Sequence, residues 1–234
     1  HPGAVYLHKG VQYRVVRLDM HERMAVCRPA NGIDYFTRAV TSEESEILSV
    51  DDSIDLNGTI INFGTLRITE RVTGYRKKQL FTDKDLGEFP LELPPSVFTT
   101  TGIWMKVDER ILDEVRSKGF SASGALHATE HAAIAALPLY ALCDRMDLGG
   151  VSYAYNPELE SAAIFIYDGH EGGVGLTKRG FDCVRDWFGS TVSLMEDCEC
   201  EVACPSCTQD PKCGNNNDPL DKRGAIMILK SWLD

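Results

Sequence analysis

Residues 198–215 read CECEVACPSCTQDPKCGN and hold five of the eight cysteines in this 234-residue chain. Cys204 and Cys207 form a CxxC pair, and this spacing lets two thiolates bind one metal ion. Zinc takes four ligands in a tetrahedron, and four thiolates leave no position open for water. We therefore predict a structural zinc site whose ligands are Cys200, Cys204, Cys207 and Cys213, with Cys198 as the alternative to Cys200.

The same cysteines allow two other interpretations. They could hold an iron–sulfur cluster, or they could be reduced or disulfide-bonded without any metal. Disulfide frameworks of secreted proteins spread their cysteines along the chain, whereas tight clusters in intracellular proteins more often bind metal. The other three cysteines, Cys27, Cys143 and Cys183, stand in apolar surroundings that are typical of buried free thiols. This distribution favours zinc.

Around the cysteine cluster, the second half of the chain alternates between helical and strand patterns. Ser123 precedes the longest helical pattern and is a plausible N-cap. The run AAIFIYDG is nearly all apolar, which is typical of a strand inside a sheet. We expect helices at residues 108–118, 123–145, 174–188 and 219–233, and strands at 151–155 and 162–169.

The first part of the chain consists of short runs rich in β-branched and aromatic residues, separated by turn signals such as Asn31-Gly32. Segment 41–55, with six acidic and no basic residues, is expected to interrupt the strands. The sequence therefore predicts an α+β fold, with a β-rich subdomain at 1–105 and an α/β subdomain at 106–234 that carries the zinc site at 198–213. Strands are expected at 5–9, 11–19, 23–28, 33–40, 59–63, 65–72 and 97–107.

The net charge of −11 argues against a free-standing nucleic-acid-binding protein, which usually presents a basic face. One basic cluster surrounds a single acid, Glu70. Such a cluster is often only a solvated face, but it is also the best candidate for contact with DNA phosphates. The candidate nucleic-acid-binding residues are Arg67, Arg71, Arg76, Lys77 and Lys78.

Nothing in the sequence indicates a membrane partner. No run approaches the roughly 18 uninterrupted apolar residues of a membrane span. The first residues show no signal-peptide pattern, and they include no initiator Met. We expect the chain to be a fragment or a processed product of a longer protein.

The pattern His127-Ala-Thr-Glu130-His131 matches the HxxEH motif of inverzincin metallopeptidases. On a helix its two histidines share one face, and the glutamate acts as general base. A peptidase site also needs a third ligand, for which Glu196 and Glu201 are the candidates. A metallopeptidase-like enzyme is therefore one alternative. The other is that these side chains are hydrogen-bonded in place at an interface.

The segment Tyr167–Leu176, YDGHEGGVGL, runs from a buried strand through glycines into a helix. Backbone N–H groups at such a helix start can hold an anion, although a packing turn explains the glycines equally well. The chain contains no GxxxxGK[ST] loop and no GxSxG elbow. The sequence thus shows neither an ATPase site nor a complete catalytic apparatus.

Three stretches together resemble a known family: LHATEHAAIAALPLYALCDRMDLGGVS, IYDGHEGGVGL and CECEVACPSCTQDPKCGNNNDPLDKRGA. They are similar to the C-terminal region of superfamily 2 DNA helicases of the MrfA and SftH type, called the MrfA zinc-binding domain. The opening residues, HPGAVYLHKGVQYRVVRLD, extend the likeness over essentially the whole chain. All five clustered cysteines match the family's cysteine pattern, and zinc is the metal that the resemblance implies.

The resemblance implies an ATP-dependent 3′-to-5′ DNA helicase and translocase, active in DNA repair, for the full-length protein but not for this chain alone. ATP and magnesium would bind RecA-like motor domains upstream of His1. The implied partners are single-stranded DNA and those motor domains, and the implied location is the bacterial cytoplasm at the nucleoid. A third possibility is a protein-interaction module whose acidic segment 41–55 docks a partner or the helicase core.

Overall fold

The computed structural model describes residues 1–82 and 84–234. The chain forms two compact units: unit 1 comprises residues 1–42 and 70–96, and unit 2 comprises residues 43–69 and 97–234. The division passes through the two longest strands, β4 (Tyr35–Leu56) and β5 (Thr59–Gln79). Strands and helices are both abundant, which confirms the predicted mixed fold class.

Unit 1 is a β structure, as the sequence predicts. Strands β1 (Val5–His8), β2 (Val11–Asp19) and β3 (Met24–Pro29) form an antiparallel sheet in the order β1-β2-β3. The unit also contains the start of β4 and the end of β5, which pairs with β6 (Asp85–Pro90). Tyr75 stacks between His1 and Phe89, with ring centroids 4.2 and 5.2 Å away.

Unit 2 is built on a sheet with the strand order β4-β5-β7-β9-β8, in which β7 spans Ser96–Val107 and β8 spans Leu148–Asn156. Strand β9 (Ser161–Asp168) lies between β7 and β8, as its apolar sequence predicts. Its side chains alternate between two cores, because successive residues of a strand point to opposite faces. Ala162, Ile164 and Ile166 enter the larger core, and Ala163, Phe165 and Tyr167 enter the smaller one.

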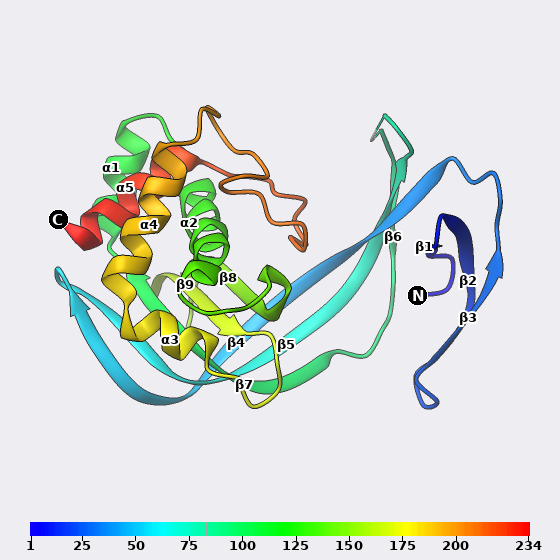
Figure 1. Cartoon of the computed structure of the whole chain (residues 1–234), viewed down its shortest axis with the longest axis horizontal. Helices are drawn as coiled ribbons and strands as arrows, with labels where there is room; N and C mark the ends of the chain where they lie inside the picture. Colours follow the sequence, from blue (N-terminus) through cyan, green and yellow to red (C-terminus); the bar gives the residue numbers. More distant parts are fainter. Residues whose placement is uncertain (83) are drawn as a thin grey trace. The chain divides into compact units, whose positions relative to one another are not determined.

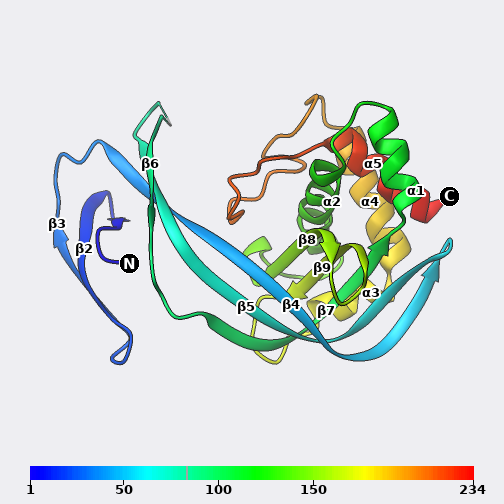
Figure 2. The ribbon, with the colours of Figure 1, turned by 180° about the vertical axis from the view of Figure 1, so that it is seen from behind.

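Five helices belong to unit 2, and α2, α4 and α5 gather on one side of strands β8 and β9 (Figures 1 and 2). Helix α2 packs against α5, α4 and β8, and twelve of its fifteen residues are buried. Small residues make this possible: a Cβ added at Gly224 would lie 2.6 Å from the Cβ of Ala125. The helices are α1 (Glu109–Ser117), α2 (Ala122–Ala136), α3 (Leu176–Asp182), α4 (Val184–Glu196) and α5 (Lys222–Leu233).

Four expectations about individual elements are wrong. The strands expected at 59–63 and 65–72 form one continuous strand, β5. The acidic segment 41–55 does not interrupt the strands but lies within β4, where exposed and half-buried residues alternate over residues 41–50. Helix α2 has Ser121 as its N-cap and ends at Ala136, because Pro138 has no N–H to continue the helical hydrogen bonds. The helix expected at 174–188 is divided into α3 and α4 at Cys183, whose backbone is not helical.

The subdomain boundary predicted at residue 105 lies near the end of β7, and that strand is grouped almost entirely with unit 2. The division into subdomains 1–105 and 106–234 stays a prediction. Among residues 1–82 and 84–234, we find no helix with the length and apolarity needed to span a membrane.

Candidate metal centre

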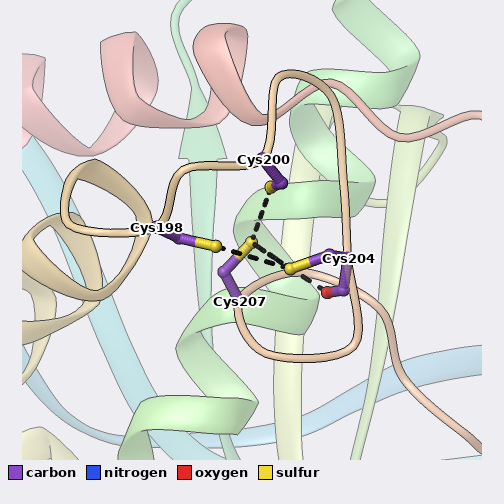
Figure 3. A group of neighbouring side chains, drawn as sticks. All are labelled: Cys198, Cys200, Cys204 and Cys207. Carbon is purple, nitrogen blue, oxygen red and sulfur yellow. Dashed lines mark hydrogen bonds between the residues drawn. The ribbon is translucent and has the colours of Figure 1, made fainter.

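Four thiols converge in the loop between α4 and α5 (Figure 3). Sγ of Cys198 lies 3.4 Å from that of Cys204, and Sγ of Cys200 lies 3.4 Å from that of Cys207. The CxxC pair, Cys204 and Cys207, is separated by 3.6 Å between its sulfur atoms. All four sulfurs lie within 4.8 Å of one another.

This arrangement fits a tetrahedral zinc ion. With Zn–S bonds of about 2.3 Å, the sulfurs of a regular tetrahedron are about 3.8 Å apart. The observed separations are close to this value and far longer than the roughly 2.05 Å of a disulfide bond. The structure therefore gathers four free thiols in the geometry of an all-cysteine structural site.

The thiols do not ionise equally. Burial opposes ionisation of Cys204, but hydrogen bonds from Cys198 and from the backbone of Ser206 outweigh it and lower the pKa of Cys204 to about 6. Burial, reinforced by the hydrogen bond with Cys207, raises the pKa of Cys200 to about 12. A metal ion bound by all four must displace their protons, so the site is built to couple metal binding to thiol deprotonation.

Lys222, the first residue of α5, anchors the cysteine loop. Its Nζ donates hydrogen bonds to the carbonyl oxygens of Cys198, at 2.8 Å, and Cys200. Its side chain is buried, and its backbone N–H donates to Val202 O. A zinc ion with four thiolates carries a net charge of −2, which this ammonium group partly offsets. Nothing in the sequence pattern singles out Lys222, because a lysine at a helix start gives no signal of burial beside a metal site.

The fifth cysteine lies elsewhere. The structure does not bring Cys213 to the other four thiols but places it beside His127 and His131 of α2, with Sγ 3.4 Å from His127 Nε2. The loop contacts α2 at two points, because Thr208 O lies 2.9 Å from His131 Nδ1 and Cys213 Sγ lies beside His127. Of the predicted ligands, Cys200, Cys204 and Cys207 are therefore grouped, and Cys198 joins them instead of replacing Cys200.

The HxxEH motif does not have the arrangement of a peptidase. Glu130 is buried against β8, where it bonds with Ser152 and would lie 2.8 Å from a Cβ added at Gly150. Burial raises its pKa to about 8. Of the expected third ligands, Glu196 pairs with Lys230 and Glu201 is exposed. Neither belongs to the metal-binding group of the two histidines within the part of the chain that the structure describes.

The glycine-rich turn after β9 already contains an anion. Asp168 is completely buried, and its carboxylate accepts hydrogen bonds from the backbone N–H groups of residues 174–177 at 2.7–3.1 Å. The hydroxyl of Thr177 also donates to it, at 2.7 Å. The N–H groups that an external phosphate would use are therefore occupied, and the turn serves packing.

The five candidate DNA contacts all lie on β5, and four of them contact other side chains. Arg67 pairs with Glu46 at 2.6 Å, Arg76 with Glu88 at 2.7 Å, and buried Lys78 with Asp85 at 3.8 Å. Lys77 lies over the rings of Tyr35 and Phe89, 5.2 and 4.4 Å from their centroids. Arg67 and Arg71 are the exposed members of the set. Their role in DNA binding stays a prediction.

Comparison with known proteins places these features in a family context. The family described as the MrfA Zn-binding domain matches residues 129–208. The chain is 29% identical over 210 residues to YprA of Bacillus subtilis (strain 168), an uncharacterised ATP-dependent helicase, and this covers 88% of the chain and 27% of YprA. It is 24% identical over 239 residues to the ATP-dependent helicase HRQ1 of Saccharomyces cerevisiae, covering 97% of the chain and 22% of HRQ1.

Two further matches differ in how much of the chain they cover. An uncharacterised protein of Methanocaldococcus jannaschii, MJ1572.1, is 38% identical over 111 residues, which are 46% of the chain and 99% of that protein. The crystal structure of the DUF1998 helicase MrfA bound to DNA superposes with a TM-score of 0.63 at 25% identity, covering 98% of the chain and 30% of MrfA. The chain thus spans less than a third of each helicase that it matches.

Proposed function

Since this chain belongs to the MrfA zinc-binding domain family, we propose that it is the C-terminal accessory domain of an ATP-dependent 3′-to-5′ DNA helicase. The observation that carries the proposal is the likeness to DNA-bound MrfA, which extends over 98% of the chain. The motor domains would bind ATP and magnesium, and this domain would engage single-stranded DNA or brace the motor. We place the parent helicase in the bacterial nucleoid, where it would act in DNA repair.

The proposed zinc ligands are Cys198, Cys200, Cys204 and Cys207. When bound, zinc supplies a structural crosslink and no catalysis, because four thiolates leave no open position. Two residues of the chain fix the position of the loop. Cys207 is buried in the large core, and Lys222 holds the loop against the start of α5. The cysteine loop would thereby keep α4 and α5 in place and present a fixed surface to the rest of the helicase.

The charge distribution supports bracing more than tight independent DNA binding. The chain carries a net charge of −11, and three of the five candidate basic residues are paired with acids. Phosphate contacts depend on cations that can displace the counterions of DNA. Arg67 and Arg71 are the exposed members of the set on β5, although Arg67 would have to exchange its ion pair with Glu46 for a phosphate.

A binding assay tests the DNA contacts. We expect the Arg67→Glu/Arg71→Glu variant of the full-length helicase to bind a single-stranded oligonucleotide more weakly, with a salt slope smaller by about 1.4, since each phosphate contact contributes about 0.7 on single strands. Fluorescence anisotropy over a range of salt concentrations measures both. Arg110→Glu, on the exposed surface of α1, is the matched control.

Two results would count against DNA contact through β5. Unchanged affinity and salt slope would make Arg67 and Arg71 part of a solvated face. If, in addition, the 234-residue chain bound no DNA at low salt but did bind the separate motor domains, the interaction-module alternative would replace the DNA-engaging role.

A further inference from the structure

A second group of metal-binding side chains lies outside the four-cysteine cluster. His127 and His131 stand one turn apart on α2, with ring centroids 4.2 Å apart, and Cys213 reaches them from the loop before α5. One ring nitrogen of each histidine and Sγ of Cys213 all lie within 4.8 Å of one another. Both histidines are buried, with exposed fractions of 9% and 3%.

Hydrogen bonds orient both imidazole rings toward the same point. His127 Nδ1 lies 2.9 Å from Pro219 O, and His131 Nδ1 lies 2.9 Å from Thr208 O. A carbonyl oxygen only accepts, so each Nδ1 must carry the proton and each Nε2 presents a lone pair. Metal-binding histidines are typically held in this way, with the second ring nitrogen bonded to a carbonyl or carboxylate.

We propose that His127, His131 and Cys213 form a second metal site, separate from the four-cysteine cluster, which binds zinc through three protein ligands. A tetrahedral zinc ion with Zn–N bonds of about 2.05 Å and Zn–S bonds of about 2.3 Å holds its nitrogen and sulfur ligands about 3.6 Å apart. The distance from His127 Nε2 to Cys213 Sγ is 3.4 Å. The fourth position is left to water.

The charges around the group suit a divalent ion. Two neutral imidazoles and one thiolate leave a bound zinc ion with a net charge of +1. The carboxylate of Asp210 is buried and acts electrostatically on both histidines and on Cys213. Sγ of Cys213 accepts a hydrogen bond from Asn217 N at 3.2 Å, which orients the sulfur. Burial raises the pKa of Cys213, so a bound metal ion itself would have to displace the thiol proton.

The site would fasten one loop to one helix. Both histidines belong to α2, whereas the site's other residues belong to the loop before α5. These loop residues are Thr208, Asp210, Cys213, Asn217 and Pro219. A metal at this point would hold residues 208–219 on α2 independently of the four-cysteine cluster at residues 198–207. Glu130 faces β8 instead, so the site has no general base from HxxEH and serves as a clasp.

Metal content of the purified 234-residue chain tests the clasp. We expect two zinc ions per wild-type chain by elemental mass spectrometry, and one in Cys213→Ser. Two matched controls should retain both ions: Glu130→Gln, within the same motif, and Cys143→Ser, a thiol outside both groups. One zinc ion in the wild type, unchanged in Cys213→Ser, would overturn the proposal and leave only a thiol–imidazole hydrogen bond.

X-ray absorption at the zinc edge of the wild-type chain gives an answer even if Cys213→Ser does not fold. A shell that mixes sulfur with imidazole nitrogen supports the second site, because the four-cysteine cluster contributes sulfur alone. A shell of sulfur only would refute it. If the cysteine cluster did not bind zinc, the all-sulfur contribution to the absorption spectrum would be missing instead. The spectrum therefore distinguishes the failure of one site from the failure of the other.

Discussion

Unit 1 and unit 2 are stabilised by different means. Unit 2 buries three tryptophans, Trp104, Trp187 and Trp232, at 1% exposure or less, and both metal-binding groups lie in it. In the described part of unit 1, Val15 is the buried apolar residue, and strand pairing, aromatic stacks and ion pairs make the other contacts. Because burial of apolar area is the main source of stability, we expect unit 2, with its large core, to be the more stable of the two units.

The strongest test of this contrast removes the metal. We expect Cys204→Ser/Cys207→Ser to lose the zinc ion of the cysteine cluster together with the fixed tertiary structure of unit 2, because binding of a structural zinc supplies on the order of 10 kcal/mol in small zinc domains. The proposed second site lies in the same unit and would be lost with that structure. Near-ultraviolet circular dichroism from the buried tryptophans and zinc content measure the two losses. Cys27→Ser in unit 1 should retain both. A variant that lacks the zinc ion of the cysteine cluster but has a native spectrum would contradict a structural role for that ion.

The next largest effect compares the two cores. Phe165→Ala on β9 should lower the free energy of unfolding by about 3–5 kcal/mol, since it empties a fully buried site between Trp104 and Tyr153. Val15→Ala in unit 1 should cost less than half as much, because it removes only two methyl groups beside exposed strands. Denaturant unfolding monitored by fluorescence gives both values. Equal costs would mean that unit 1 is as tightly packed as unit 2.

The smallest effect distinguishes two buried lysines. Lys222→Met should lower the zinc affinity of the cysteine cluster about 10- to 100-fold, because it removes the hydrogen bonds to the carbonyls of Cys198 and Cys200. Lys78→Met in unit 1, where the ammonium pairs with Asp85, should leave the affinity unchanged. Competition with a zinc chelator measures it. If both variants weakened zinc binding alike, the effect would come from general destabilisation instead of from Lys222.

Sequence reasoning succeeded where the deciding signal is local. The CxxC pair and the density of cysteines indicate zinc because ligand chemistry depends on residues close in the chain, and the apolar run of β9 predicts its place inside the sheet. The partner of Cys213 was not predictable, because it depends on how the loop returns across α2. The strand character of 41–55 was missed because its acids obscure the alternation that places half of its residues outward.

The N-cap of α2 and the ion pairs of β5 could not be predicted from the sequence either. The sequence predicts Ser123 as the N-cap of α2, whereas the bond from Gly124 N to Ser121 Oγ shows that Ser121 has this role. The basic residues of β5 look like a cationic patch until their acidic neighbours on adjacent strands are known. Such pairs join residues 12 and 21 positions apart, beyond the reach of a local pattern.

The carboxylate of Asp168 has a wider consequence for reading glycine-rich loops. In the turn after β9, the backbone N–H groups that could bind a phosphate instead bind the carboxylate of Asp168, the last residue of the preceding strand. Glycine spacing alone therefore overstates nucleotide binding. When an acid ends the strand before such a loop, its carboxylate can accept the hydrogen bonds of the loop N–H groups. The glycine pattern then indicates a packed turn and not a ligand-binding site.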